Sequence, residues 1–215
     1  MYFSSDWKTI MTGPVLVIGA TGTIGSAVVS ELQGSHSIIA AARTSGESID
    51  LADHGSIEAA MTRIGEEHGP LDGIISCAGG GMIGRVSEYD LDDFLPRLGP
   101  KLLGQVAVVR HGSRIVRPGG AIVLTSGILE RSPQVGMSHL AVINAGLRGF
   151  VRNAALEYPG LRISVVSPGL VEESPPKVLD LFGDMSRIAA GKLADVYRHA
   201  LEHGESGVVH EAFGD

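Results

Sequence analysis

The chain has 215 residues, of which 44% are hydrophobic, and this size and composition allow one well-buried domain and exclude a disordered chain. Its formal charge of −7, without a run of Lys or Arg, argues against a nucleic-acid partner, and no apolar run is long enough to span a membrane. The single cysteine, Cys77, excludes an internal disulfide and indicates a reducing compartment, so we expect a cytoplasmic protein.

After an irregular leader expected at residues 1–13, short apolar runs alternate with segments of helical periodicity. The apolar runs predict buried parallel strands at 14–18, 37–42, 49–51, 73–78, 121–125, 162–167 and 207–210. Helical spacing predicts helices at 23–33, 57–68, 91–116, 137–158 and 186–203. Pro96 and Pro100 are expected to break the first part of the third helix.

This alternation predicts the fold class: α/β, with a single Rossmann-type doubly wound parallel sheet and helices on both faces. We expect residues 14–215 to form one domain. Only residues 44–48 separate the second strand from the third, which is too few for a crossover helix. The third strand is therefore expected to be short and to lie at the sheet edge.

Three glycines lie where the first strand passes into the first helix. Gly19 allows a sharp turn, Gly22 lets the backbone approach a pyrophosphate, and Gly25 lets the helix pack closely on the sheet. The phosphates would bind the free N–H groups at the positive end of the helix. This context favours a dinucleotide site; the alternative is an ordinary glycine-rich turn without a ligand.

The end of the second strand bears on the choice of dinucleotide. An NAD site usually places an acid about 20 residues after the turn, on the ribose 2′-hydroxyl. This chain has Arg43 and Thr44 there, which suit a 2′-phosphate and so favour NADP(H). The alternative is a solvated surface arginine.

Further motifs follow the glycine turn: Asp50-Leu51, Cys77-Ala78-Gly79, Ser167-Pro168-Gly169-Leu170, and the stretch from Asn144 to Phe150. With that turn, they resemble the short-chain dehydrogenase/reductase family from Val15 to about Val209. The resemblance implies an NADP(H)-dependent oxidoreductase that pairs as a homodimer or homotetramer through two long helices. Together, the residues and the resemblance give a predicted cofactor site of Gly19, Thr21, Gly22, Thr23, Ile24, Gly25, Arg43, Thr44, Asp50, Leu51, Cys77, Ala78, Gly79, Pro168 and Gly169.

The family's chemistry rests on a Tyr acid/base, a Lys four residues later, a Ser and a helical Asn. Carried over one at a time, the Tyr falls on Leu140 and the Lys on Asn144. The Ser falls on Gly127, with Ser126 one residue early, and the Asn falls on Lys101. Because Leu140 has no titratable proton, the usual transfer of a hydride and a proton cannot run from that position.

The Lys and Asn of the family are exchanged in this chain. If both side chains point into the cleft, Lys101 presents an ammonium to ribose or substrate and Asn144 holds it; otherwise Lys101 lies on a solvated face. Ser126 is a third candidate catalytic residue, against the alternative that its hydroxyl caps backbone. The single cysteine forms no Cys/His cluster with the histidines, so we expect no metal.

Two functions remain open at this point. The first is an oxidoreductase acting on a small carbonyl-type substrate with a degenerate catalytic set. The second is a non-catalytic NADP-binding sensor or subunit, which would need no small-molecule substrate. Glu172-Glu173 are expected in a mobile lid over the pocket rather than as a catalytic pair.

Overall fold

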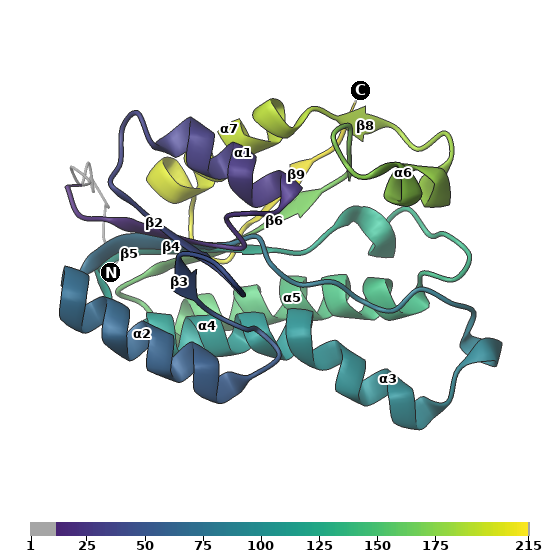
Figure 1. The fold of residues 1–215 in the computed structure, drawn as a ribbon, viewed down its shortest axis with the longest axis horizontal. Coiled ribbons are helices and arrows are strands. Elements are labelled where there is room, and N and C mark those ends of the chain that lie inside the picture. Colours follow the sequence, from purple (N-terminus) through teal and green to yellow (C-terminus); the bar gives the residue numbers. More distant parts are fainter. Residues whose placement is uncertain (1–11, 215) are drawn as a thin grey trace.

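The computed structural model describes residues 12–214, so the expected leader at 1–13 lies almost wholly outside the described residues. It confirms a doubly wound α/β fold with seven parallel strands in the order β3-β2-β1-β4-β5-β6-β9 (Figure 1). The strands are β1 (Val15–Ile18), β2 (Ile38–Ala42), β3 (Glu47–Ser48), β4 (Leu71–Ser76), β5 (Val116–Thr125), β6 (Arg162–Pro168) and β9 (Val209–Ala212). The order reverses between β1 and β4, where folds of this kind open a crevice at the carboxyl ends of the strands.

Helices cover both faces of the sheet (Figure 1). On one face lie α1 (Thr23–Leu32) and α7 (Ala190–His203), and on the other α2 (His54–His68), α4 (Gly104–Gly112) and α5 (Ser138–Glu157). Each face has its own apolar core, because the strand residues alternate between the two layers. Leu16 and Ile18 pack toward α2 and α4, whereas Val15 and Val17 pack toward α1 and α7. None of the helices within residues 12–214 is long and apolar enough to cross a membrane.

The third strand lies at the sheet edge as expected, but its residues differ from the prediction. It is formed by Glu47–Ser48, which pair with Ala41 and Ala42, and not by residues 49–51. Ile49 and Leu51 are buried in the core layer beneath the sheet instead. Burial in this layer removes more of their apolar surface from water than a position in the edge strand would.

The predicted helix at 91–116 is divided in the structure. It comprises α3 (Leu91–Leu98), a π-helical turn η2 (Gly99–Leu103) and α4, and Val116 already belongs to β5. Pro96 lies inside α3 and Pro100 inside η2, so the chain stays helical through both prolines. Proline removes a helical N–H, and the wider turn at η2 accommodates this loss.

The segment between β6 and α7 is more ordered than its sequence suggested. It contains α6 (Pro176–Phe182) and a separate ladder of β7 (Leu170–Val171) with β8 (Arg187–Ile188). The predicted helix at 186–203 therefore begins only at Ala190. Glu173, expected in a mobile lid, accepts a hydrogen bond from Ala190 N at 2.8 Å and so fixes the start of α7.

A buried carboxylate joins the start of the described chain to the sheet. Asp72 is fully buried, accepts a hydrogen bond from Gly13 N at 2.7 Å, and pairs with Arg117 Nε at 2.5 Å.

Asp72→Asn is expected to lower the free energy of unfolding by about 3 kcal/mol, because it removes one charge of a buried pair. Urea unfolding measures this. The control Asp195→Asn alters an exposed pair with Arg198 and should cost less than about 1 kcal/mol; equal losses would contradict the prediction.

Candidate functional site

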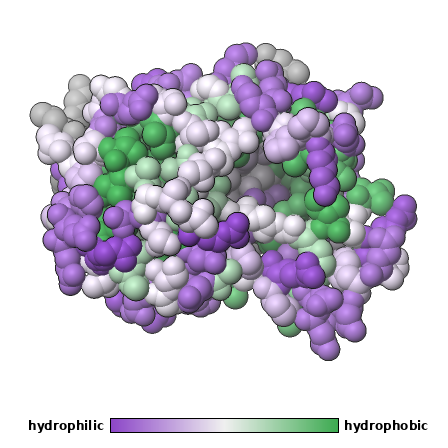
Figure 2. Space-filling view, viewed as in Figure 1, coloured by the Kyte–Doolittle hydropathy of each residue, from purple (hydrophilic) through white to green (hydrophobic). Residues whose placement is uncertain are grey.

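The surface is hollowed just beyond the carboxyl ends of the central strands, between α6 and α5 (Figure 2). Two adjoining cavities lie there. The first, of about 390 Å³, is formed around the glycine turn and is called the glycine-turn cavity below. The second, of about 210 Å³, contains Lys101 and is called the lysine cavity. Pro100 lines the first and Lys101 the second, so the two meet at η2.

Most of the predicted cofactor residues line the glycine-turn cavity. They come from the ends of β1, β2 and β4 and from the loop after β3: Gly19, Thr21, Gly22, Arg43, Asp50, Leu51, Cys77, Ala78 and Gly79. Ile24, Pro168 and Gly169 line the lysine cavity instead. Thr23, Gly25 and Thr44 line neither cavity.

Two of the three glycines in the turn have the local roles that their spacing predicts. Gly19 has a φ of +83°, a left-handed conformation that favours glycine, and a Cβ there would lie 3.0 Å from Ala78. A Cβ at Gly25 would lie 2.0 Å from the Gly19 carbonyl oxygen, so α1 packs against the turn only without a side chain. At Gly22 the nearest atom would be 3.4 Å away, which leaves that backbone open to a ligand.

The start of α1 is free of competing groups. Its N-terminal cap, Gly22, offers no side-chain hydrogen bond, and the first turn carries no acidic residue. The backbone N–H groups and the positive end of the helix dipole are therefore directed at whatever lies in the cavity. This arrangement suits a pyrophosphate.

Two side chains at the far end of this cavity bear on the nucleotide. Arg43 is exposed at the end of β2, and no acid stands beside it at Thr44 or Ser45. Asp50 is half-buried, lines the cavity, and accepts a hydrogen bond at its Oδ1 from Ala52 N at 3.0 Å. These residues could hold the ribose and adenine of a dinucleotide.

The positions expected for the catalytic set all lie around the lysine cavity. Lys101, Ser126, Gly127, Leu140 and Asn144 line it, from η2, the end of β5 and α5. Lys101 does not lie on a solvated face. Its Nζ donates a hydrogen bond to the Ser126 carbonyl oxygen at 2.7 Å, and burial lowers the pKa of its ammonium to about 8.

Asn144 and Ser126 are both buried. The Ser126 hydroxyl donates to the Val166 carbonyl oxygen at 3.4 Å, so it bonds to backbone instead of facing a substrate. The Asn144 Oδ1 has no hydrogen-bond partner among the described residues. A Cβ at Gly127 would lie 3.0 Å from Asn144 Nδ2, so the side-chain amide occupies the space beside that glycine.

His139, the neighbour of Leu140, is fixed away from the lysine cavity. Its Nδ1 accepts a hydrogen bond from Met82 N at 3.2 Å, and its Nε2 donates to the Phe94 carbonyl oxygen at 3.1 Å. One nitrogen accepts and the other donates, which is the pattern of a neutral ring. His139 therefore anchors the loop after β4 to α3.

Sequence reasoning missed the residues of α6 and the loop after it that line the lysine cavity. Val178, Phe182 and Met185 add an apolar wall opposite Lys101. The signal was an apolar spacing of four at Val178 and Phe182, which two adjacent prolines obscured. The cavity therefore suits an organic ligand with an apolar body and one polar group at Lys101.

Cys77 is half-buried at the end of β4, so a reagent can reach it, but burial raises the pKa of its thiol to about 12. At pH 8 we expect the aromatic disulfide reagent DTNB to react with it about a thousandfold more slowly in the folded protein than in urea, since only the thiolate is nucleophilic. Absorbance of the released thiolate measures both rates. Similar rates in the two states would show that the pKa is not raised.

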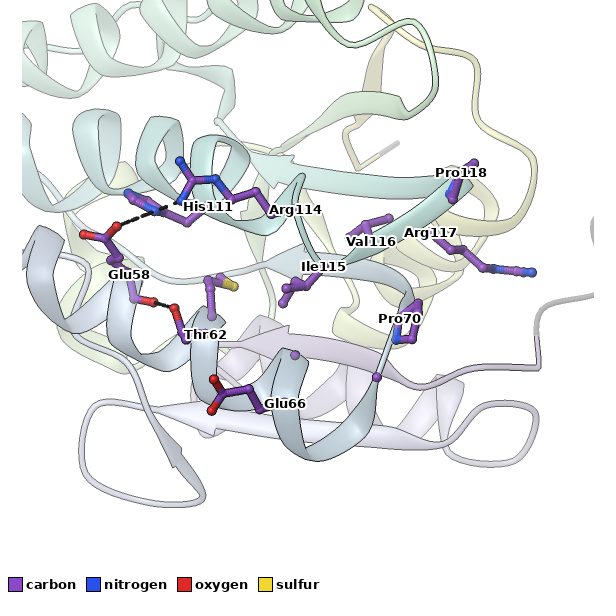
Figure 3. Close-up of a pocket in the computed structure, with 13 residues that line it drawn as sticks. Glu58, Thr62, Glu66, Pro70, His111, Arg114, Ile115, Val116, Arg117 and Pro118 are labelled. Atoms are coloured by element: carbon purple, nitrogen blue, oxygen red, sulfur yellow. Dashed lines mark hydrogen bonds and ion pairs between the residues drawn. The ribbon is translucent and has the colours of Figure 1, made fainter.

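A third cavity, of about 520 Å³, lies between α2 and α4 at the amino ends of β4 and β5 (Figure 3). Its polar side is formed by Glu58, which faces His111 at 3.7 Å and Arg114 at 4.0 Å. None of the predicted site residues lines it. Ligands of doubly wound folds bind at the opposite, carboxyl edge of the sheet, so this cavity is not the candidate active site.

One group of potential metal ligands exists among the described residues: Glu47, Glu67 and His68. Glu47 already pairs with Arg63 at 2.7 Å, and Glu67 and His68 are exposed. We draw no metal site from this group.

Comparisons with known proteins agree with this geometry. Residues 25–193 match a family model described as enoyl-(acyl carrier protein) reductase. The crystal structure of the protein lin1944 from Listeria innocua has a TM-score of 0.88 and 30% identity, and the match covers 93% of this chain and 99% of that one. The chain belongs to the short-chain dehydrogenase/reductase family.

Other members of the family are also similar to this one. A 3-oxoacyl-[acyl-carrier-protein] reductase of Vibrio harveyi is 26% identical over 85% of this chain and 75% of its own. A small-chain dehydrogenase solved in complex with NADPH is 25% identical, with a TM-score of 0.82, and the match covers 94% of this chain and 96% of that one. In the chain described here, every position to which the resemblance assigns a catalytic residue borders the lysine cavity.

Proposed function

We propose that this protein is an NADP(H)-dependent oxidoreductase that reduces a small, largely apolar carbonyl compound. One observation carries the proposal: the glycine-turn cavity, with Arg43 at its far end, adjoins a smaller cavity whose one charged group among the described residues is a half-buried lysine. A dinucleotide in the first cavity would point its reactive end toward the second. The NADPH complex of a related dehydrogenase supports the choice of cofactor.

The residues that would hold NADPH divide into three groups. The turn from Gly19 to Gly25 would bind the pyrophosphate, Arg43 the 2′-phosphate, and Asp50 and Leu51 the adenine. When bound, NADPH supplies a hydride. The protein supplies orientation, exclusion of water by the apolar wall of α6, and a proton.

A titration of the whole chain with NADPH and with NADH tests the binding step, and we expect tighter binding of NADPH. Oxidation of NADPH is then followed at 340 nm with 2,3-butanedione, a 3-oxoacyl thioester and simple ketones. Binding of neither nucleotide would refute the cofactor proposal.

A second function remains because the Tyr position is Leu140 and the Ser position is Gly127. Neither side chain has a proton to donate, which suits an NADP-binding sensor or subunit without activity. Tight NADPH binding with no turnover of any carbonyl compound would favour this second function over the first.

We also propose that residues 14–215 act as one domain and that the protein is a homodimer or homotetramer in the cytoplasm. Among the described residues, α5 exposes a row of apolar residues, Val142, Ala145, Gly149 and Leu156, interrupted by the exposed Asn153, and Leu156 is 80% exposed. A second copy could cover this row closely, because its small residues allow helices to approach. Gly146 does not belong to the row, since it faces Leu102. Sedimentation as a monomer would refute this assembly.

A further inference from the structure

The backbone around Lys101 is unusual in a way that brings its side chain to the strand ends. Lys101 lies in the π-helical turn η2, where Gly104 N bonds the Gly99 carbonyl oxygen. Such turns are rare and frequently lie at functional sites. The turn packs tightly on the end of β4: Gly79 has a φ of +107°, and a Cβ there would lie 2.9 Å from Lys101 Cα.

The Lys101 ammonium is held in place by one hydrogen bond, which uses only one of its donors. One of its three protons is donated to the Ser126 carbonyl oxygen at 2.7 Å. Among the described residues that line the lysine cavity, Lys101 is the only charged side chain, and most of the others are apolar. A carbonyl oxygen that enters this cavity therefore meets one acidic proton donor.

We propose that Lys101 is the general acid of the reduction, in the role for which Leu140 has no proton. The inference rests on the proposed function. NADPH, when bound, would supply the hydride for the new C–H bond, and the electron pair of the C=O π bond would move to oxygen. That oxygen takes a proton from Lys101 Nζ, so an N–H bond breaks and an O–H bond forms. The neutral amine then recovers a proton from solvent.

The surroundings of Lys101 suit this exchange. Burial alone lowers the pKa of its ammonium to about 8, which allows both proton donation and reprotonation near neutral pH. The titratable and charged groups nearby on α5 already have partners. The His139 ring is hydrogen-bonded to Met82 and Phe94. Arg148 forms ion pairs with Glu130 and Glu211.

The remaining neighbours add no competing acid. The Cys77 thiol after β4 stays protonated, because burial raises its pKa. The charged side chains of α3, which are Asp92, Asp93 and Arg97, are exposed, and His111 lies at the far end of α4. The pH dependence of proton donation is therefore expected to follow Lys101.

The test compares Lys101→Met and Lys101→Arg with the control Lys192→Met, which alters an exposed lysine of α7. With 2,3-butanedione or another reduced compound of the panel, kcat of both Lys101 variants should fall by about a hundredfold or more. The NADPH dissociation constant should stay within about twofold. Arginine keeps the charge but holds its proton too firmly to donate it. In the unaltered protein, kcat for reduction should fall as the pH rises through about 8.

A second readout does not depend on turnover. Amine acylation of the unaltered protein, followed by mass spectrometry at each lysine, should be half-maximal near pH 8 at Lys101, well below the ordinary lysine pKa of about 10.4. An ordinary titration of Lys101 would overturn the proposal. So would full turnover by Lys101→Met, or a folded Lys101→Met variant that loses NADPH binding more than tenfold, since the lysine would then hold the cofactor.

These outcomes separate the two levels of the proposal. If the unaltered protein binds no NADPH or reduces no compound, the proposed function fails and the acid role falls with it. If the unaltered protein reduces a carbonyl compound and Lys101→Met does so equally well, only the acid role fails. The acylation profile measures the titration of Lys101 in the unaltered protein, so it tests the acid role even if the Lys101→Met variant does not fold.

Discussion

Gly25→Ala is expected to abolish NADPH binding and to lower the free energy of unfolding by about 3 kcal/mol. The added Cβ would lie 2.0 Å from the Gly19 carbonyl oxygen and 2.6 Å from its carbonyl carbon. Both atoms belong to backbone, so no flexible side chain can yield. Either α1 moves away from the sheet or the turn deforms, and both displace the N–H groups proposed to bind the pyrophosphate.

Gly191→Ala is the matched control for this substitution. Gly191 lies in α7, is exposed, and has no atom within 4 Å of its added Cβ. Alanine should there leave NADPH binding unchanged and stabilise the helix by up to about 1 kcal/mol. Urea unfolding and nucleotide titration measure both variants. A Gly25→Ala protein that binds NADPH normally would show that close packing of α1 is not required.

Arg43→Ala is expected to weaken NADPH binding by about 10- to 100-fold and to leave NADH binding unchanged. The guanidinium is the cation that the end of β2 offers to a 2′-phosphate, and a charge-assisted hydrogen bond contributes about 1.5–3 kcal/mol. NADH has no 2′-phosphate and so cannot report the loss. Calorimetric titration with both nucleotides measures the ratio.

Arg152→Ala provides the comparison, since Arg152 is an exposed arginine of α5 and lines none of the three cavities described above. It should change neither affinity. An equal loss of NADPH and NADH affinity in Arg43→Ala would mean that Arg43 contributes only general attraction. Unchanged NADPH affinity in Arg43→Ala would mean that Arg43 is only a solvated surface residue.

Much of the fold could be predicted from local sequence. The strands around β1, β4 and β6 are short apolar runs buried on both faces, and that pattern marks a parallel sheet without further information. The glycine turn could also be predicted from sequence, because Gly19 and Gly25 each meet a local requirement of the backbone. Predictions were wrong where tertiary packing outweighed the local pattern. Ile49 and Leu51 were predicted in the edge strand, but they pack in the core.

Part of the candidate site could also be predicted from sequence, and part could not. The residues proposed for the cofactor follow strand ends, and parallel strands bring their carboxyl ends to one edge, so sequence could place them together. Lys101 was different, because sequence allowed either a solvated face or the cleft. The π-helical turn and the contact with Gly79 decided between the two, and neither has a local sequence signal beyond Pro100 and a glycine.

The sequence alone therefore determined a dinucleotide fold, its glycine turn, and the departures at Leu140, Asn144 and Gly127 from the set that the family resemblance implies. Those features depend on residue type and spacing, which are local. The tertiary structure decided that α6 walls the lysine cavity, that Glu173 fixes the start of α7, and that Lys101 donates a hydrogen bond to the Ser126 carbonyl. Contacts of this kind join residues far apart in the chain, so the distances and burial that give them their chemistry exist only in the folded molecule.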